Sequence, residues 1–461
     1  MIEAIMDRRL FMQSATMAVA SLALSSPVSA RQKPNIIFIM ADDLGYGDLG
    51  CYGGNKVNTP NIDRMAREGL KFTQHYAGST VCAPSRCCIM TGLHTGHAYI
   101  RGNKEIQPEG QWPLPAETDT IAKRMKKAGY KTGIVGKWGL GSPGSEGEPN
   151  KQGFDHWFGY LCQREAHSFY PDHLWRNGER VELDGKTYSH DLMTKEVLDF
   201  IEDSKEDPFF LYVPYTIPHA ALQVPAESMD PYMGKFGDDP ERPTGHYAKQ
   251  KHPRAAFAGM VSRMDRDVGR ILQQLKTLGL AENTLVMFSS DNGPHREGGH
   301  DPKYFDSNGP LRGIKRDLYD GGIRVPMIAY WPGTIQAGTE TDHISAFWDL
   351  MPTYLELGGA EPPRNIDGIS MAPLLTGKPN RQKKHEYLYW EFHRGGFNQA
   401  IRMGKWKAVR LGLESPIELY NIENDIGETD NVAEKHPAIV KKAETLFKKA
   451  HTESKLFPMK R

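Results

Sequence analysis

Residues 34–47 read PNIIFIMADDLGYG, and this segment indicates the class of fold most directly. It opens with a continuous apolar run, Ile36 to Ala41, which is typical of a strand buried on both faces of a mainly parallel sheet. The run ends in Asp42 and Asp43, followed by glycine-rich sequence. Open α/β sheets bind their ligands beyond the carboxyl ends of their strands. The segment therefore predicts an α/β fold with a ligand site directly after this strand.

A second segment, far downstream, has the same plan. Residues 285–293 read LVMFSSDNG, an apolar strand followed by Asp291, Asn292 and a glycine. Two such strands in one sheet would bring both polar pairs to the same edge. Their ligand atoms are all oxygens, which suit Ca²⁺, and less preferably Mg²⁺, rather than Zn²⁺. Because grouped carboxylates without a cation are costly, we expect Asp42, Asp43, Asp291 and Asn292 to hold a divalent metal.

The rest of the N-terminal three quarters alternates strand and helix patterns. Apolar runs at 132–135 and 209–213 predict strands, and helical spacing of apolar residues occurs at 62–70, 121–128 and, most clearly, 255–278. This alternation predicts one large α/β domain over residues 33–375.

Two stretches interrupt the alternation. Residues 139–176 are rich in Gly, Pro, His and aromatic side chains, and we expect this loop to carry substrate contacts. Residues 226–253 are rich in Pro, Gly and Asp, and we expect them to form a surface excursion.

The character of the chain changes after residue 375. Polar sequence at 378–384 resembles a linker, and residues 376–461 predict a small α+β subdomain. Its expected elements are a strand at 387–392, a hairpin at 399–411, a short strand at 417–420 and a final helix at about 437–455.

Composition excludes several classes of protein. The chain has 461 residues with 57 basic and 57 acidic side chains, so its net charge gives no case for a nucleic-acid partner. A hydrophobic share of 39% indicates a folded protein with a large core. The five cysteines are too few for a disulfide scaffold, and we expect Cys87 and Cys88 to be buried apolar residues.

The N-terminus has the pattern of a targeting segment. Arg8 and Arg9 precede an apolar stretch at 15–24, which is too short to span a bilayer, and small residues follow at 28–30. Residues 1–30 therefore predict a cleavable signal peptide and export to the periplasm or the extracellular space. The paired arginines favour the twin-arginine type, and an ordinary Sec signal stays the alternative. No other run predicts a membrane span.

The segment CAPSR at 82–86 carries the chemistry. Cys82 lies where a helix should begin, with Pro84 in its first turn and Gly92 at its end. A helix start attracts anions, and Arg86 adds a planar cation suited to an oxyanion. Taken alone, the motif also fits a buried cysteine in a short helix.

The motif resembles the signature of the type I sulfatases. This resemblance covers about residues 34–375 most clearly, and it implies an alkaline-phosphatase-like α/β/α sandwich with a large mixed sheet and a small C-terminal α+β subdomain. It also implies that a sulfatase-maturing enzyme, which would be a partner, oxidises Cys82 to formylglycine, the nucleophile. In the family, residues matching Asp42, Asp43, Asp291 and Asn292 bind Ca²⁺ together with the formylglycine.

The resemblance also implies the remaining catalytic roles. Arg86 matches the arginine that braces the nucleophile. Lys137, in the sequence GKWGLG, and Lys315, in LRGIK, match two lysines that contact sulfate. His219 matches the histidine placed near the leaving oxygen, where it would act as general acid.

One position departs from the family pattern. The family commonly reads Gly-Lys-Trp-His-Leu-Gly, whereas this chain has Gly139 in place of the histidine. That histidine is the usual candidate for assisting collapse of the hemiacetal that releases sulfate. Our hypothesis is that His167, or less favourably His295 or His300, takes over this role.

The substrate prediction comes from a subset of bacterial carbohydrate sulfatases that looks similar at Gly139 and over residues 150–171. This subset suggests a galactose or N-acetylgalactosamine sulfate of a polysaccharide. Polar and aromatic side chains together suit a sugar, with ordinary packing as an equal alternative. The candidate sugar contacts are Arg164, His167, Trp390, Glu391 and His393.

The sequence thus predicts an exported, Ca²⁺-dependent sulfuric ester hydrolase, an arylsulfatase-like enzyme of sulfated polysaccharide degradation. Two alternatives stay open. One is a phosphodiesterase or phosphonate hydrolase of the same superfold. The other is a glycan-binding pseudoenzyme, suggested by Gly139 alone.

Overall fold

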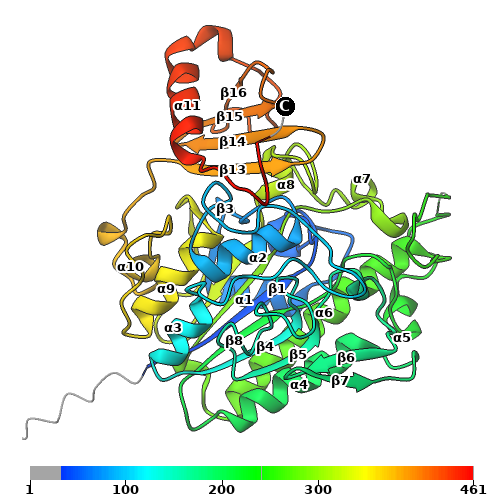
Figure 1. The fold of residues 1–461 in the computed structure, drawn as a ribbon. Helices are drawn as coiled ribbons and strands as arrows, with labels where there is room; N and C mark the ends of the chain where they lie inside the picture. The colour runs from blue at the N-terminus through cyan, green and yellow to red at the C-terminus, as the bar shows by residue number, and fades with distance from the viewer. Residues whose placement is uncertain (1–32, 240, 460–461) are drawn as a thin grey trace, which may run out of the picture. The chain divides into compact units, whose positions relative to one another are not determined.

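A ten-stranded mixed sheet forms the centre of the structure (Figure 1). The computed structural model describes residues 33–239 and 241–459, so the signal peptide predicted at 1–30 lies outside the described residues. The strands follow in spatial order: β11 (Thr339–Thr341), β2 (Leu70–Phe72), β10 (Met327–Tyr330), β9 (Thr284–Ser290), β1 (Asn35–Ala41), β8 (Phe209–Pro214), β4 (Lys131–Lys137), β5 (His156–Tyr160), β6 (His173–Arg176) and β7 (Glu179–Glu182).

The middle of the sheet is parallel, as the apolar runs predicted. β1 pairs in parallel with β8 on one side and β9 on the other, and every residue of these three strands is buried. Towards the edges, β10 runs antiparallel to β9, and β6 runs antiparallel to β5. The register between β1 and β9 pairs Ala41 with Ser290, so the next residues of both strands emerge side by side.

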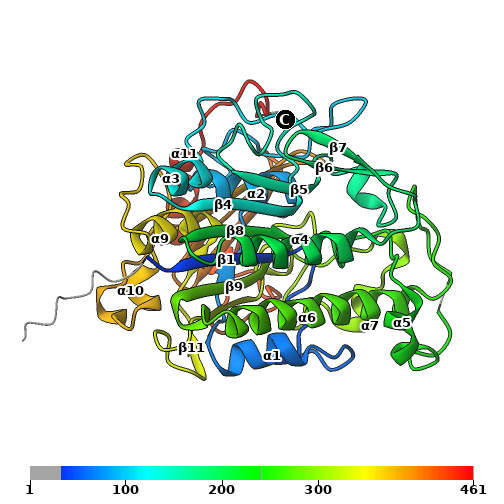
Figure 2. The same cartoon turned by 90° about the horizontal axis from the view of Figure 1, so that it is seen from below.

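Helices cover both faces of the sheet (Figure 2). Alternate side chains of β1 enter separate cores: Ile36 and Phe38 join one, and Ile37 and Ile39 join the other. The first core is closed by α2 (Cys82–Thr91), α3 (Ile121–Lys127) and α9 (Leu350–Leu357), and the second by α1 (Pro60–Arg67), α4 (Ser189–Asp203) and α6 (Pro253–Thr277). The α/β class is therefore confirmed, with a layered helix, sheet and helix arrangement.

Two element predictions need correction. The helix expected at 62–70 ends at Arg67. After it, Gly69 passes close to β10, where a Cβ would be 2.4 Å from the Ala329 oxygen. Leu70 then begins β2. The stretch 139–176, expected to be loop, contains β5 and β6, which extend the sheet beyond β4.

Shorter elements connect these layers. β3 (His75–Tyr76) and β12 (Ser345–Ala346) pair in parallel as a separate two-stranded sheet. The short helices are α5 (Ala226–Met229), α7 (Pro302–Phe305), α8 (Asp320–Ile323) and α10 (Ala372–Leu375).

A second, antiparallel sheet follows near the C-terminus, as predicted (Figure 1). Its strands, in order, are β13 (Leu388–His393), β14 (Phe397–Met403), β15 (Trp406–Leu411) and β16 (Glu418–Asn421), and α11 (Pro437–Ala450) follows them. One face of this sheet packs on α11. The other face contributes to the first core of the large sheet, so both faces are covered.

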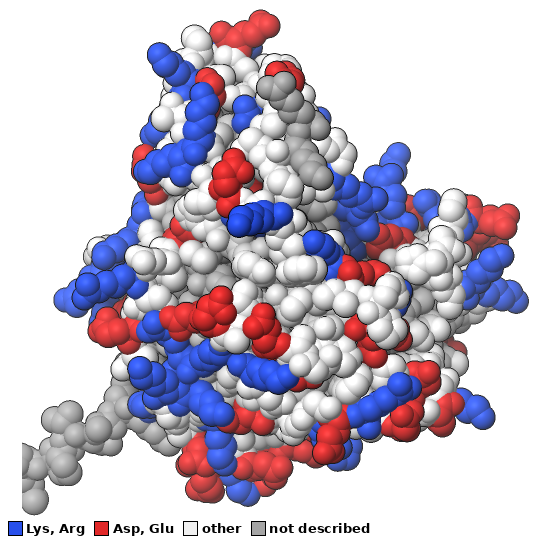
Figure 3. Space-filling view, in the orientation of Figure 1, with Lys and Arg blue, Asp and Glu red and all other residues white. Residues whose placement is uncertain are grey.

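The described residues give three further findings. All five cysteines are free, and Cys87 and Cys88 are buried as expected. In the part of the chain that the structure describes, no helix combines the length and the apolar character needed to cross a membrane. Lys and Arg are interspersed with Asp and Glu over the face shown in Figure 3.

Candidate active site

Cys82 is the first residue of α2, as the CAPSR motif predicted. Val81 before it is extended, and Gly92 ends the helix in the left-handed conformation. The Ala83 backbone N–H donates to Asn103 Oδ1 at 3.1 Å, which satisfies one of the free donors of the helix start. The Cys82 side chain is 2% exposed, so its thiol lies inside the protein.

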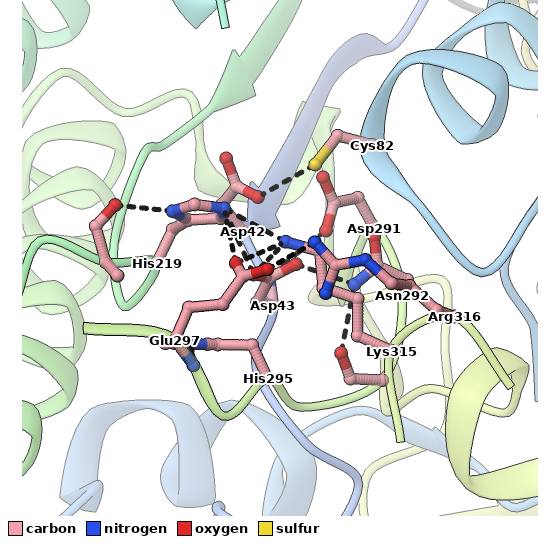
Figure 4. A network of polar contacts seen from close by, with 12 residues as sticks. Asp42, Asp43, Cys82, His219, Asp291, Asn292, His295, Glu297, Lys315 and Arg316 are labelled. Carbon is pink, nitrogen blue, oxygen red and sulfur yellow. Dashed lines mark hydrogen bonds and ion pairs between the residues drawn. The ribbon is translucent and has the colours of Figure 1, made fainter. Parts of the chain in front are cut away.

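The ends of β1 and β9 bring the predicted metal ligands together (Figure 4). The Asp43 backbone N–H donates to Asp291 Oδ1 at 3.0 Å. Asn292 Nδ2 donates to Asp43 Oδ1 at 2.7 Å. Because β1 and β9 are neighbouring parallel strands in register, residues about 250 positions apart occupy one small space.

Cys82 and Lys137 join this group. The Cys82 thiol donates to Asp42 Oδ1 at 3.6 Å, and Lys137 Nζ lies 3.6 Å from Cys82 Sγ. Lys137, the last residue of β4, also donates to Asp42 Oδ2 at 2.5 Å. The structure therefore places residue 82 against the acidic cluster.

Arg86 and Ser85 tie α2 to β9. Arg86 donates to Asp291 Oδ2 at 2.8 Å and, through its other terminal nitrogen, to the Lys137 carbonyl oxygen. Ser85 Oγ donates to the Asp291 carbonyl oxygen at 2.6 Å and accepts from the Gly78 N–H. Sequence reasoning gave Ser85 no role, although it stands inside the motif.

Lys315 and His219 complete the centre. Lys315 Nζ donates to Asp43 Oδ2 at 2.7 Å, to His219 Nε2 at 3.0 Å and to Glu297 Oε2 at 3.2 Å, so each of its three N–H groups has an acceptor. His219 Nδ1 faces the Ala220 carbonyl oxygen. The Nε2 of His219 is therefore the nitrogen that points to the centre.

The donor set fits a hard divalent cation. Asp42, Asp43 and Asp291 supply carboxylate oxygens, and Asn292 Oδ1 is buried with no hydrogen-bond partner among the described residues. Possible ligand atoms of Asp42, Asp43, Cys82 and His219 lie within 4.8 Å of one another. A buried amide oxygen without a donor needs a partner, and Ca²⁺ or Mg²⁺ would supply one.

Burial and neighbouring charges shift the pKa values of the groups in this centre in opposite directions. Burial alone would raise the pKa of Asp42, but Lys137, His219 and Arg86 hold it well below its usual value. Burial and the charge of Asp42 raise the pKa of Asp291 to about 7. Burial, with the same carboxylate, also raises the pKa of the Cys82 thiol. The unmodified thiol is therefore neutral and a poor nucleophile.

Three residues at the edge of the centre, Glu297, Arg316 and Tyr247, were not predicted. Glu297 bonds Arg316 as well as Lys315, and it accepts from the Tyr247 hydroxyl at 3.2 Å. Tyr247 belongs to the stretch 226–253, which lies largely at the surface as expected but also contacts the edge of the centre through this residue. A signal was available for Glu297, since it follows the Asp291-Asn292 pair within the same loop.

The histidines proposed to replace the missing one differ in position. His167 stacks on His219 with ring centroids 5.0 Å apart, and His295 stacks on His219 at 5.5 Å. His300 stacks on Phe257 at 3.9 Å. His167 and His295 therefore both contact the ring that faces the centre, whereas His300 packs in the neighbouring core.

The space beside residue 139 is filled by another side chain. Gly139 has a positive φ of 77°, and a Cβ added there would lie 2.9 Å from Gln163 Nε2. Gln163 is 4% exposed, and its Nε2 has no partner among the described residues. A histidine at 139 would therefore require Gln163 to move.

The other predicted sugar contacts lie elsewhere. Trp390 and Glu391 are 0% exposed in β13; Trp390 donates to the Ala77 carbonyl oxygen, and Glu391 accepts from Arg101. Since neither side chain reaches solvent, neither can contact a sugar in this structure, and both are packing residues. His393 is half-buried and bonds Glu391, and Arg164 bonds the Pro108 carbonyl oxygen.

Comparison with protein families gives two matches. A model of the family described as Sulfatase matches residues 34–360. The description of the second, which matches residues 313–453, is N-sulphoglucosamine sulphohydrolase, C-terminal. Together these matches span both sheets of the structure.

Individual proteins are similar over most of their length. N-acetylgalactosamine-6-sulfatase of Mus musculus is 33% identical over 424 residues, covering 85% of this chain and 74% of that protein. Arylsulfatase A of Homo sapiens is 34% identical over 474 residues, covering 89% and 85%. The structure of Ps i-CgsB in complex with k-i-k-neocarrahexaose matches with a TM-score of 0.77 and 32% identity, covering 91% and 93%. The alkaline-phosphatase-like fold is thereby confirmed.

Proposed function

Because this chain belongs to the sulfatase family and is a sulfuric ester hydrolase, we propose that it removes sulfate from a carbohydrate, using formylglycine made from Cys82 and a bound Ca²⁺. The observation that carries this proposal is the contact of Cys82 with Asp42 and Lys137 inside the oxygen-rich cluster.

The carbohydrate substrate is supported by the similar proteins. One relative is named for N-acetylgalactosamine 6-sulfate, and a similar structure contains a neocarrahexaose. We propose a galactose or N-acetylgalactosamine sulfate of a polysaccharide as the substrate class. His167, at the half-buried edge of the centre, is our candidate for contact with the sugar, with Arg164 and His393 as weaker candidates.

Two groups would supply chemistry that the twenty amino acids lack. Formylglycine offers a hydrated aldehyde as nucleophile, and a divalent cation held by Asp42, Asp43, Asp291 and Asn292 offers positive charge for sulfate oxygens. An alkaline-earth ion suits these ligands better than zinc does, because all four offer oxygen.

The chain's own residues bind and orient the ester. Lys137 lies beside residue 82, and Arg86 and Lys315 lie on the neighbouring Asp291 and Asp43, so three fixed positive charges would favour the charge that develops on sulfate oxygens. Burial strengthens these interactions because it excludes water. Arg86 is held by Asp291 and a backbone carbonyl, so it orients the centre without reorganising during the reaction.

His219 and Lys315 would act on the leaving side. His219 Nε2 faces Lys315 Nζ at 3.0 Å, so a proton can be held between these nitrogens and delivered to the departing sugar oxygen. The Nδ1 contact with the Ala220 carbonyl oxygen fixes the orientation of the ring.

The proposal includes a cellular route. A sulfatase-maturing enzyme would convert Cys82, and the segment at 1–30 would direct export to the periplasm or the extracellular space. If the twin-arginine interpretation holds, conversion must precede export, because that route carries folded proteins.

Peptide mass analysis followed by a substrate screen tests the proposal. We expect the peptide containing Cys82 to carry the aldehyde after expression with a maturing enzyme. Defined sulfated saccharides should then release sulfate, with galactose or N-acetylgalactosamine esters turned over fastest. A preference for phosphate or phosphonate esters of the same alcohol would overturn the assignment.

A further inference from the structure

Glu297 makes an unusual set of contacts for a residue with no assigned role (Figure 4). Its Oε2 accepts from Lys315 Nζ at 3.2 Å and from the Tyr247 hydroxyl at 3.2 Å, and it lies 3.6 Å from His219 Nε2. Its Oε1 accepts from Arg316. One carboxylate thus contacts both residues of the proposed leaving side.

Glu297 lies closer to solvent than the two residues that it contacts. Its side chain is 15% exposed, whereas the side chains of Lys315 and His219 are each 3% exposed. Glu297 therefore lies on the solvent side of Lys315 and His219, and Asp43 lies on their buried side at 2.7 Å from Lys315 Nζ. Substrate must enter from the solvent side.

Asp43 and Glu297 hold the Lys315 ammonium from opposite sides and so fix its position. If Glu297 lost its charge, Lys315 would keep Asp43 and His219 as strong acceptors, and its third N–H would lose a charged partner. The ammonium would then relax towards Asp43, away from the incoming ester. Arg316 holds the Glu297 carboxylate in place, and Tyr247 fastens the long loop at 226–253 to it.

We propose that Glu297 is a positioning residue that fixes Lys315 and His219 for proton delivery to the leaving oxygen. This inference rests on the proposed function. A sugar alkoxide is a poor leaving group and needs a proton in the transition state, whereas a nitrophenolate leaves without one. The contribution of Glu297 therefore grows with the basicity of the leaving group.

Kinetics with two leaving groups test this inference. The values of kcat and kcat/KM are measured for 4-nitrophenyl sulfate and for a sugar sulfate that the parent enzyme hydrolyses. Glu297→Gln keeps the shape and removes the charge, and we expect a loss of about 30-fold in kcat on the sugar ester, within the range of general-acid effects, and less than about 3-fold on the aryl ester. Tyr247→Phe should show the same divergence at smaller size.

A matched control separates positioning from general damage. Glu241→Gln removes one negative charge from an exposed residue of the loop at 226–253, which also contains Tyr247. This variant should leave kcat on both substrates unchanged. An equal loss on both esters in Glu297→Gln, or no loss on either, would overturn the inference. If the parent enzyme cleaves no sugar sulfate, the proposed substrate class fails. Aryl sulfates of rising leaving-group pKa then replace the sugar ester. The loss of kcat in Glu297→Gln should still grow with the leaving-group pKa.

Discussion

Two buried groups of polar residues, one at the ends of β1 and β9 and one around Glu391 in β13, were both predicted to serve the active site, and the structure separates them. The first contains Asp42, Asp43 and Asp291 among cations. In the second, Glu391 alone accepts from several donors. These donors are Arg101 at 2.9 Å, Tyr389 at 2.9 Å, His451 at 2.8 Å and His393 at 3.2 Å.

The difference lies in what is left unpaired. Both oxygens of Glu391 accept from protein donors, so this carboxylate needs no cation, although the Nε2 of His451 beside it has no hydrogen-bond partner among the described residues. In the first cluster, Asn292 Oδ1 is buried without a partner among the described residues. Residue type and burial are therefore poor signs of a site. The unpaired Asn292 oxygen supports a cation site because it lies among three carboxylates; unpaired acceptors elsewhere in the described part of the chain, such as Gln111 Oε1, lack that setting.

The largest expected effect is the loss of turnover when Cys82, in the first cluster, is replaced. Cys82→Ala should lower turnover of any sulfate ester by at least about 10³-fold, because it removes the nucleophile's precursor. Sulfate release measures the effect. Cys88→Ala, in the same helix but with its sulfur bonded to the Gly78 carbonyl oxygen, should keep the kcat of the folded protein. Activity of Cys82→Ala within tenfold of the parent would place the nucleophile elsewhere.

Metal removal distinguishes the clusters next. Dialysis against a chelator should lower activity at least about 100-fold, and Ca²⁺ should restore it, because the cation supplies charge to the transition state. Ca²⁺ at 100 times its Kd should also stabilise the folded protein by about 2.7 kcal/mol, measured by thermal unfolding. Asn292→Ala should weaken this response, and Glu391→Gln should not. Equal rescue by Zn²⁺ would contradict the oxygen-ligand assignment.

Replacing Glu391 should affect stability instead of turnover. Glu391→Gln leaves Arg101 buried without a charged partner, and we expect a loss of about 3 kcal/mol in the free energy of unfolding. Denaturant unfolding measures this loss, and kcat per folded molecule should stay unchanged. A fall in kcat with unchanged stability would return Glu391 to the substrate site.

The pH dependence of stability checks the same cluster. Burial alone would raise the pKa of Glu391, but His393, His451 and Arg101 hold it at about 2, below its usual 4.5. Because the folded-state pKa is lowered, this stabilisation is complete above about pH 4.5 and is lost as the pH falls towards 2. In Glu391→Gln, the free energy of unfolding should fall less steeply between pH 4.5 and pH 2 than in the parent.

The sequence could predict the first cluster because its determinants are local. An apolar strand followed by Asp42 and Asp43, and another followed by Asp291, place their polar ends at one sheet edge by a general rule. The role of Glu391 was not accessible in this way. β13 is covered on both faces, by α11 and by the large sheet's core, so alternation of side chains does not distinguish a buried face from a binding face.

Glu297 and Tyr247 show a second limit of the sequence. Their contact joins the loop after β9 to the irregular stretch at 226–253. Loops without periodicity carry no pattern that predicts which distant residue they will meet. The sequence therefore predicted the surface position of this stretch but not its contact with the centre.

Among the smaller effects, the histidines test what replaces the side chain missing at residue 139. His167→Ala should lower kcat on the best substrate by about tenfold, since the ring contacts His219 at the half-buried edge of the centre. His295→Ala should have a smaller effect on kcat, and His300→Ala should mainly reduce stability, because its ring packs on Phe257. Steady-state kinetics and thermal unfolding separate these outcomes. Full activity of all three variants would contradict the hypothesis.

The smallest expected effect compares single hydroxyl groups in the two clusters. Tyr389→Phe removes a hydroxyl that donates to Glu391 and accepts from Gln399 at 2.7 Å, and we expect it to cost about 1 kcal/mol of unfolding free energy with kcat unchanged. Tyr247→Phe removes a hydroxyl that donates to Glu297, and it should lower turnover of a sugar ester with little change in stability. Denaturant unfolding and kinetics on both variants provide the check. If both variants changed only stability, the proposal that Tyr247 and Glu297 assist turnover would be contradicted.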